Sequence, residues 1–422
     1  MGTMKNSRLS SVILWSVISA AFIGPGTVTT AASAGSGFGL QLLWAVSFAT
    51  FACIILQEVS ARLAIVSGLT MGQALQKKYG DFGSKWLKYI LGGPVVLGCA
   101  AYEAGNILGA VSGLNLLTKL DVRWMTIFVT AACFLILWGD RRQTIGWLMT
   151  FLVGLMGISF FILAAGQPYT LFEYLSNSIV PSLPPGAELL TLALVGTTIV
   201  PYNVFLGSGI SKGQTVYLMR VGLTISVIIG GLITAAILIA GTAVTSFSSY
   251  EELASALTKE IGPLGSWSLG VGLFAAGFSS AITSPYAGSI IANHVFQWSP
   301  GNQKAMWILI LVTGFIFGIS GVKPIPVILA VQALNGLVLP LLTAFLIILI
   351  NDPHLNPKAR MTTSVYNLIL LVIFGSVLLM GLNNVDKSFS SWAGLSGSHF
   401  NWTATITVIL TGILALRLMM KR

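Results

Sequence analysis

Long apolar runs, separated by short polar stretches, recur along almost the whole chain. We assign twelve of them to membrane crossings, each of which takes about 20 helical residues. They are residues 10–35, 41–66, 89–117, 124–139, 145–166, 188–211, 217–245, 266–295, 305–320, 326–350, 364–383 and 402–420. The pattern predicts an all-α integral membrane protein with about twelve transmembrane helices, which we number 1 to 12 in chain order.

Composition narrows the class further. Only 8% of the 422 residues are charged and 55% are hydrophobic, whereas about 25% of the residues in a soluble protein are charged. These values exclude a cytosolic enzyme, a nucleic-acid-binding protein and a disordered chain. The net charge of +10 lies mostly in short loops, so we expect no nucleic-acid partner. The lipid bilayer is the expected partner, and no cofactor is predicted.

The distribution of lysine and arginine predicts the orientation. With a cytoplasmic N-terminus, 17 of the 22 basic residues face the cytoplasm and 5 face outside, and the opposite topology inverts this ratio. We therefore predict that both termini are cytoplasmic, in a membrane of the bacterial cytoplasmic type. The connections between runs are too short for a catalytic domain, so we expect transport across the membrane rather than enzymatic activity.

Two runs are interrupted by proline. Helix 1 carries Gly24-Pro25-Gly26-Thr27 and helix 6 carries Val200-Pro201-Tyr202-Asn203. Proline removes a helical hydrogen bond, and unwound backbone in a membrane is tolerated only inside protein or beside a cavity. Helices 1 and 6 begin two five-helix halves, residues 1–166 and 167–355, which two accessory helices in 356–422 follow. Matching breaks predict an inverted-repeat transporter with its site at the breaks; two unrelated kinks are the alternative.

Three further stretches carry a resemblance to a known family. They are Leu56-Gln57-Glu58-Val59-Ser60-Ala61-Arg62-Leu63 in helix 2, Gly277-Phe278-Ser279-Ser280-Ala281-Ile282-Thr283 in helix 8, and Asn351-Asp352-Pro353 after helix 10. Together they resemble the NRAMP (natural resistance-associated macrophage protein) family of metal-ion transporters over about residues 10–355. The resemblance implies a LeuT-like 5+5 inverted repeat, alternating access and a substrate site between helices 1 and 6.

The chain departs from this family at the site itself. The family's Asp-Pro-Gly-Asn falls on residues 24–27, so Gly24 replaces the aspartate and Thr27 replaces the asparagine. Its Met-Pro-His falls on residues 200–202, so Val200 replaces the thioether ligand and Tyr202 the histidine. A backbone carbonyl that binds metal in the family would come from Thr197. No transition-metal ligand set is retained.

Three functions stay open at this stage. Loss of the soft ligands and of the carboxylate disfavours dehydrated Mn²⁺ or Fe²⁺ and favours a hydrated or hard cation such as Mg²⁺. A neutral polar solute such as a sugar is the second hypothesis, and a channel or non-transporting sensor is the third. The predicted substrate-binding residues are Gly24, Gly26, Thr27, Thr197, Val200, Tyr202 and Asn203.

Glu103 is a carboxylate near the middle of helix 3. An ionisable residue inside the membrane is by default a candidate functional residue. The family resemblance places Glu103 and Asn106 on two acidic positions of a proton route, of which one is retained. We predict that Glu103 is a proton relay or a direct substrate contact, with a proton or sodium as the coupling ion. The alternative is a protonated Glu103 that hydrogen-bonds a neighbouring helix.

Other intramembrane polar residues fall into three groups. Glu58 and Arg62 lie four residues apart on one face of helix 2, which predicts an ion pair or a gate element. Ser279, Ser280 and Thr283 in helix 8 are candidates for an oxygen cage around Na⁺ beside the helix 1 break, or for packing between helices. Gln332 and Asn335 share a face of helix 10 and either line the pathway or bridge helices.

Overall fold

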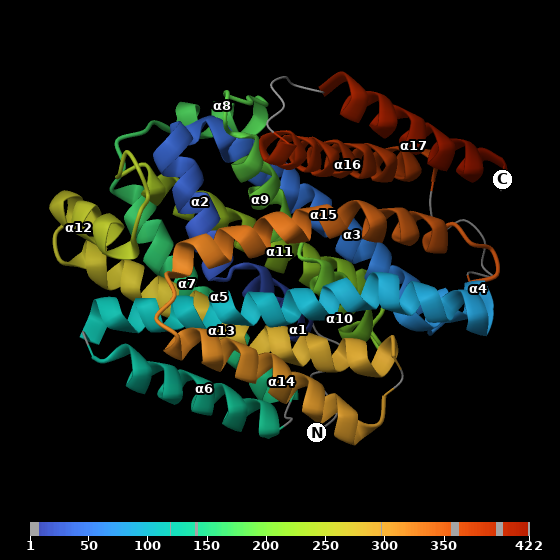
Figure 1. Cartoon of the computed structure of the whole chain (residues 1–422), viewed down its shortest axis with the longest axis horizontal. Helices are drawn as coiled ribbons and strands as arrows, with labels where there is room; N and C mark the ends of the chain where they lie inside the picture. The colour runs from blue at the N-terminus through green and yellow to red at the C-terminus, as the bar shows by residue number, and fades with distance from the viewer. Residues whose placement is uncertain are drawn as a thin grey trace.

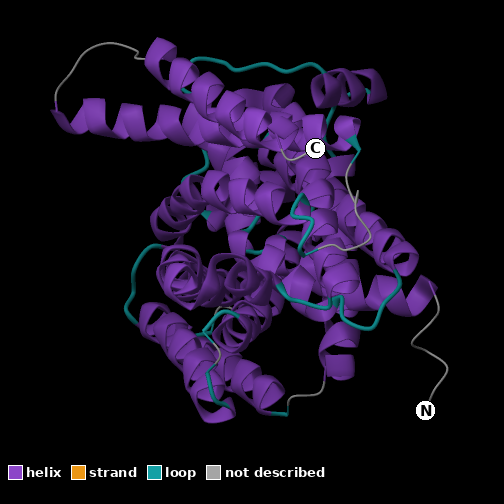
Figure 2. Cartoon of the chain, turned by 90° about the vertical axis from the view of Figure 1, so that its right-hand side faces the viewer, coloured by secondary structure: helices purple, strands orange, loops and turns teal. Residues whose placement is uncertain are grey.

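Helices account for most of the chain in a computed structural model, which describes residues 8–118, 120–139, 142–296, 298–355, 363–393 and 400–420. Within these ranges no strand is present (Figure 2). Nine helical segments of the described chain are long and apolar enough to cross a membrane, and Arg8–Phe22, Val122–Trp138 and Val338–Ile350 are shorter apolar helices. The predicted all-α integral membrane fold is confirmed.

Every predicted run falls on one helix or on two consecutive helices. The helices that correspond to the runs are α1 (Arg8–Phe22) with α2 (Pro25–Phe38), α3 (Leu43–Ser67), α5 (Gly93–Thr118), α6 (Val122–Trp138), α7 (Arg142–Ala165), α9 (Glu188–Thr198) with α10 (Pro201–Ile210), α11 (Val216–Gly241), α13 (Leu264–His294), α14 (Pro300–Ile319), α15 (Pro324–Ile350), α16 (Ser364–Ala393) and α17 (Phe400–Met420). Short turns η2 (Gly39–Leu42) and η3 (Lys88–Gly92) precede α3 and α5.

Three further helices lie outside the predicted runs. They are α4 (Met71–Leu87), α8 (Leu171–Ile179) and α12 (Tyr250–Ile261). The α4 and α12 helices lie at opposite ends of the long helices (Figure 1). This placement fits the alternating sides on which successive connections must emerge when the intervening helices cross a bilayer.

Small residues allow the central helices to approach closely. In α5 and α13, Gly113 lies against the backbone of Phe274, and Gly277 lies against the backbone of Ala110. A side chain at either glycine would overlap the neighbouring helix, so these contacts fix the distance between the two helices. The accessory helices α16 and α17 lie along the edge of the bundle (Figure 1). The division of the chain at residues 166 and 355 stays a prediction.

Candidate functional site

The two proline breaks have the same local construction. The α1 helix ends at Phe22, and α2 restarts at Pro25 after Gly24, whose backbone is extended (φ −95°, ψ −176°). The α9 helix ends at Thr198, and α10 restarts at Pro201 after Val200, also extended (φ −72°, ψ 126°). Proline disfavours helical geometry at the preceding residue but fits the first position of a helix. Each proline therefore ends one helix and begins the next.

Proline also leaves one carbonyl at each break without its helical donor. In a continuous helix the Ala21 carbonyl would accept from the N–H of residue 25, and the Thr197 carbonyl from the N–H of residue 201. Both of these residues are prolines, which have no N–H. The hydroxyl of Tyr202 donates to the Ala21 carbonyl over 2.9 Å. Tyr202 of α10 thus supplies the donor that the Ala21 carbonyl lacks at the end of α1. The two breaks face each other across this buried hydrogen bond.

Hydroxyl groups from three helices gather at the C-terminal end of α1. Ser279 and Ser280 of α13 both donate to the Ala20 carbonyl, over 3.3 and 3.1 Å. The Thr27 hydroxyl lies 2.7 Å from that of Thr197 and donates to the Phe22 carbonyl. All these side chains are buried. The break is therefore surrounded by carbonyl and hydroxyl oxygens.

The remaining predicted residues of helix 6 and helix 1 also lie at the break. Asn203 donates from Nδ2 to the Ile18 carbonyl over 3.5 Å, and its Oδ1 is buried without a partner among the described residues. Val200 is buried and brings only an aliphatic side chain. Gly26 is buried in the first turn of α2. These positions supply an amide oxygen but no sulfur or imidazole.

Gly24 is closely surrounded. A Cβ atom there would lie 2.7 Å from Ser280 Oγ and 3.4 Å from Asn106 Oδ1. The first distance is shorter than real Cβ contacts, so a larger residue needs α13 or its serine to shift. In this conformation the space that an aspartate side chain would take is already filled by oxygen atoms of α13 and α5.

The side chain of Asn106 separates Glu103 from the break. The residue is completely buried in α5, and Asn106 Nδ2 donates to its Oε2 over 3.2 Å. Its other oxygen, Oε1, has no hydrogen-bond partner within the described part of the chain. Gly314 of α14 packs beside the Glu103 side chain. Asn106 therefore stands between the buried carboxyl group and Gly24.

Tyr102 connects the same part of α5 to α10. Its ring meets the Tyr202 ring edge-on, with centroids 5.6 Å apart. An edge-on aromatic pair is favourable and holds both rings in place. Tyr202 is thereby held between Tyr102 and the Ala21 carbonyl. Sequence reasoning missed Tyr102, although it directly precedes Glu103.

The other predicted pathway residues are placed differently. Thr283 donates to the Ser279 carbonyl of its own helix over 3.1 Å, which is the usual bond of a helical threonine. Gln332 and Asn335 lie in α15, but their side chains are outside those that the structure describes. Gln57 of α3, which was not predicted, is buried against Gly207 with both amide atoms unpartnered among the described residues.

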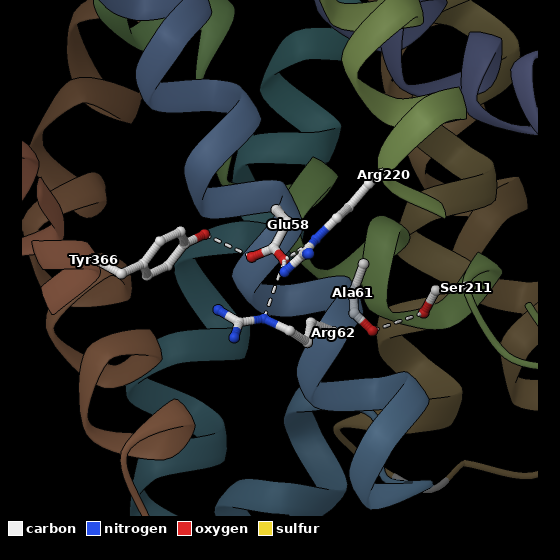
Figure 3. Close-up of polar contacts among 6 residues, drawn as sticks. All are labelled: Glu58, Ala61, Arg62, Ser211, Arg220 and Tyr366. Atoms are coloured by element: carbon white, nitrogen blue, oxygen red, sulfur yellow. Dashed lines mark hydrogen bonds and ion pairs between the residues drawn. The ribbon is translucent and has the colours of Figure 1, made fainter. Parts of the chain in front are cut away.

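A polar network around Glu58 joins three helices (Figure 3). Arg62 Nε lies 3.1 Å from Glu58 Oε1, and Arg220 Nη2 of α11 lies 2.8 Å from the same oxygen. Tyr366 of α16 donates its hydroxyl to Glu58 Oε2 over 2.6 Å, and the Arg62 guanidinium carbon lies 5.0 Å from its ring centre. The gate role of Glu58 and Arg62 stays a prediction. Through Tyr366, the network also includes the accessory helix α16.

Arg220 and Tyr366 were not singled out from sequence. A signal for Arg220 was available, because it is a basic residue inside the apolar run that becomes α11. Tyr366 lies near the start of α16 and carries no pattern that connects it to Glu58, 308 residues earlier.

Facing proline breaks in a bundle of membrane-spanning helices are the arrangement expected of a LeuT-like transporter. The sequence profile of the Nramp family, described as natural resistance-associated macrophage protein-like, matches residues 1–385. The chain belongs to this family of membrane metal-ion transporters, which are not enzymes.

Solved structures share the fold. A manganese transporter from Eremococcus coleocola, in complex with an aromatic bis-isothiourea substituted compound, matches with a TM-score of 0.76 and 18% identity over 100% of this chain and 94% of that chain. MhsT in complex with L-phenylalanine matches with a TM-score of 0.60 and 16% identity, over 89% of this chain and 99% of that chain. Mhp1, a nucleobase-cation-symport-1 family transporter, matches with a TM-score of 0.58 and 16% identity, over 96% and 92%.

Proposed function

We propose that this transporter carries a hard, partly hydrated cation, with Mg²⁺ as the first candidate, through a site between the α1–α2 and α9–α10 breaks. The observation that supports the proposal is the all-oxygen environment of the break. Its described groups are the carbonyls of Ala20 and Ala21, the hydroxyls around them and the Asn203 amide oxygen. Oxygen ligands suit Mg²⁺, whereas Mn²⁺ and Fe²⁺ gain from nitrogen and sulfur.

The position of the Glu103 carboxyl group favours a cation that keeps water. Gly24 and Val200 bring no charge to the break, and the Glu103 carboxyl group stands behind Asn106. A dehydrated divalent ion beside Gly24 would have no adjoining carboxylate and would lose most of its hydration energy. Mg²⁺ gives up its waters reluctantly and can be held through them. We propose that water bridges the cation to Glu103 Oε1.

Cargo binding at the break requires an exchange of partners. The Tyr202 hydroxyl and the two serine hydroxyls now bond the carbonyls of Ala21 and Ala20. A cation that takes these carbonyl oxygens must displace the hydroxyls, which then turn their own oxygen lone pairs toward it. Each displaced bond costs about 1 kcal/mol, which the ion–oxygen contacts must exceed.

We further propose that protons couple to transport through Glu103. Its burial and its single partner, Asn106, leave one carboxyl oxygen available for proton exchange with the pathway. Sodium is the alternative coupling ion, for which Ser279 and Ser280 are the proposed ligands. Alternating access then opens the break to the two sides in turn, with the Glu58 network as a gate on the proposed cytoplasmic side and both termini cytoplasmic.

One observation favours a neutral polar solute as the second candidate cargo. The break itself contains no charged side chain, and the groups around it are hydrogen-bonding hydroxyls and amides. A neutral solute the size of a sugar could form hydrogen bonds with the same groups. It would need no negatively charged side chain beside it, unlike a divalent cation. The two candidates differ in whether cations bind and whether Glu103 matters.

The test is cation uptake into proteoliposomes that contain the purified protein. We expect Mg²⁺ uptake that an inward proton gradient stimulates and a sodium gradient does not. Glu103→Gln is expected to reduce uptake at least tenfold, whereas Glu251→Gln, which neutralises an exposed carboxylate on α12, leaves it unchanged. Calorimetry with Mn²⁺ and Mg²⁺ accompanies the assay.

Three results discriminate the alternatives. Tight Mn²⁺ binding would show that the loss of soft ligands does not set selectivity. Stimulation by sodium alone would assign coupling to Na⁺. No binding or uptake of either divalent ion would reject the hard-cation proposal in favour of the neutral solute.

A further inference from the structure

A polar cavity lies at the end of the bundle where α4 meets the C-terminal end of α15. Its volume is about 410 Å³, and it is lined by Lys77, Lys78, Asp352, Pro353, His354 and Leu355. This volume falls in the range of small-ligand sites, roughly 300–1,000 Å³. The residues belong to neither the breaks nor the Glu58 network, so the cavity is a separate feature.

Both carboxylate oxygens of Asp352, the acidic residue of the cavity, have partners. Asp352 is buried, and its Oδ2 is paired with the Lys78 ammonium group. Its Oδ1 accepts the backbone N–H of His354 over 2.9 Å. Asp352 therefore holds the turn after α15 and attaches α4 to it. Because its charge is neutralised by Lys78, it does not repel an anion in the cavity.

The remaining polar lining favours an anion. Lys77 is exposed and has no ion-pair partner among the described residues, and His354 is also exposed beside it in the lining. After Lys78 and Asp352 cancel, the lining keeps the positive charge of Lys77 and the imidazole donor of His354. An ammonium group and an imidazole are suited to a phosphate oxygen.

The cavity adjoins segments that we expect to lie at the membrane interface. The α4 helix leads directly into the membrane-spanning η3–α5 segment, and the turn at 352–355 directly follows α15. At the start of this segment Tyr89 and Ile90 are 59% and 50% exposed. Exposed aromatic and aliphatic side chains next to basic residues are typical of the membrane interface. A lipid can therefore place its phosphate in the cavity while its chains stay in the bilayer.

We propose that this cavity binds the phosphate of an anionic phospholipid headgroup, with Lys77 and His354 as its ligands. Basic pockets between transmembrane helices on the cytoplasmic side recognise such headgroups. The proposal rests on the proposed cytoplasmic position of α4 and not on the identity of the cargo. A bound headgroup would bridge α4 and the turn after α15, in addition to the Lys78–Asp352 pair.

The experiment measures thermal stabilisation of the full-length protein in detergent by short-chain phospholipids. We titrate dioctanoyl phosphatidylglycerol and, as the neutral comparison, dioctanoyl phosphatidylcholine. We expect phosphatidylglycerol alone to raise the midpoint temperature of unfolding. Its affinity should fall as salt is added. Lys77→Gln is expected to weaken this affinity about fivefold, because a lysine near an anionic surface contributes about 1 kcal/mol. His354→Ala is expected to weaken it by a similar factor, because it removes a hydrogen-bond donor worth about 1 kcal/mol.

The matched control is Lys212→Gln. Lys212 is an exposed lysine between α10 and α11, on the same predicted side of the membrane but outside the cavity. This variant should bind phosphatidylglycerol like the wild type. Equal weakening by Lys212→Gln would show general charge attraction and overturn the proposal, as would equal stabilisation by phosphatidylcholine.

A third titration separates the two sources of phosphate. Inorganic phosphate and glycerol 3-phosphate are added alone and in competition with phosphatidylglycerol. Weak binding of both supports the lipid, because they lack the acyl chains. If either binds as tightly as phosphatidylglycerol, the cavity is a site for a soluble phosphate and the lipid proposal is wrong. None of these readouts involves cargo, so failure here leaves the proposed function untouched.

Discussion

The hydroxyl of Tyr366 connects the accessory helix α16 to the Glu58 carboxylate of α3, and its removal has a calculable effect. The hydroxyl donates over 2.6 Å, while the Arg62 guanidinium faces the ring at 5.0 Å (Figure 3). Tyr366→Phe keeps the ring and its contact with Arg62 and removes only the donor. The variant therefore isolates one hydrogen bond between α16 and α3.

The magnitude follows from the charge of the acceptor. A hydrogen bond to a charged group contributes about 1.5–3 kcal/mol. Glu58 keeps Arg62 at 3.1 Å and Arg220 at 2.8 Å after the substitution, so the carboxylate is not left unpaired. We therefore expect the lower end, a loss of about 1.5 kcal/mol in the free energy of unfolding, or slightly more than tenfold in the equilibrium constant.

The assay is reversible unfolding in mixed micelles, with the wild type and Tyr89→Phe as references. Tyr89 is 59% exposed, so removal of its hydroxyl should change the free energy by less than about 0.5 kcal/mol. In the Glu58→Gln background the acceptor is neutral, and the Tyr366→Phe effect should fall to about 1 kcal/mol or less. A Tyr366→Phe variant as stable as Tyr89→Phe, or an effect of Tyr366→Phe that Glu58→Gln leaves unchanged, would show that the hydrogen bond to Glu58 does not stabilise the protein.

Two further predictions concern a glycine contact and an exposed helix cap. Gly109→Ala should lower the free energy of unfolding by about 1–3 kcal/mol, since its Cβ would overlap the Pro25 ring, whereas Gly154→Ala, in open space, should not; equal stability of both variants would contradict this. On α8, hydrogen bonds from the Thr170 backbone N–H and hydroxyl hold the pKa of the Glu173 carboxyl below its usual value. The cap is stable above the carboxyl's unfolded pKa and is lost as pH falls through the lower folded pKa, so amide protection in α8 should drop only when the pH falls below the usual range of a glutamate pKa. In Glu173→Gln this drop should be absent.

The helices and their breaks follow from local sequence. Twelve apolar runs predicted the positions of the membrane helices, because length and hydropathy alone decide whether a helix can cross a bilayer. The breaks at Gly24 and Val200 were predicted correctly for an equally local reason. Proline lacks an N–H wherever it lies, so the helix hydrogen bond is lost whatever the surrounding fold.

The contacts around the site depended on the tertiary structure. Gly24 could be identified as a departure from the family motif, but only the position of Ser280 shows that a larger side chain there would require this serine or α13 to shift. Tyr202 was a predicted site residue, yet its bond to the Ala21 carbonyl, 181 residues earlier, had no sequence signal.

By itself the sequence determined an all-α membrane protein with two proline breaks and a buried carboxyl group at Glu103. Only the tertiary structure decided which oxygens surround the break and which residues complete the Glu58 network. The physical reason is that backbone breaks depend on neighbours in the chain. Contacts between helices depend instead on their depth and rotation in the bundle, which are set by close packing at small residues such as Gly113 and Gly277.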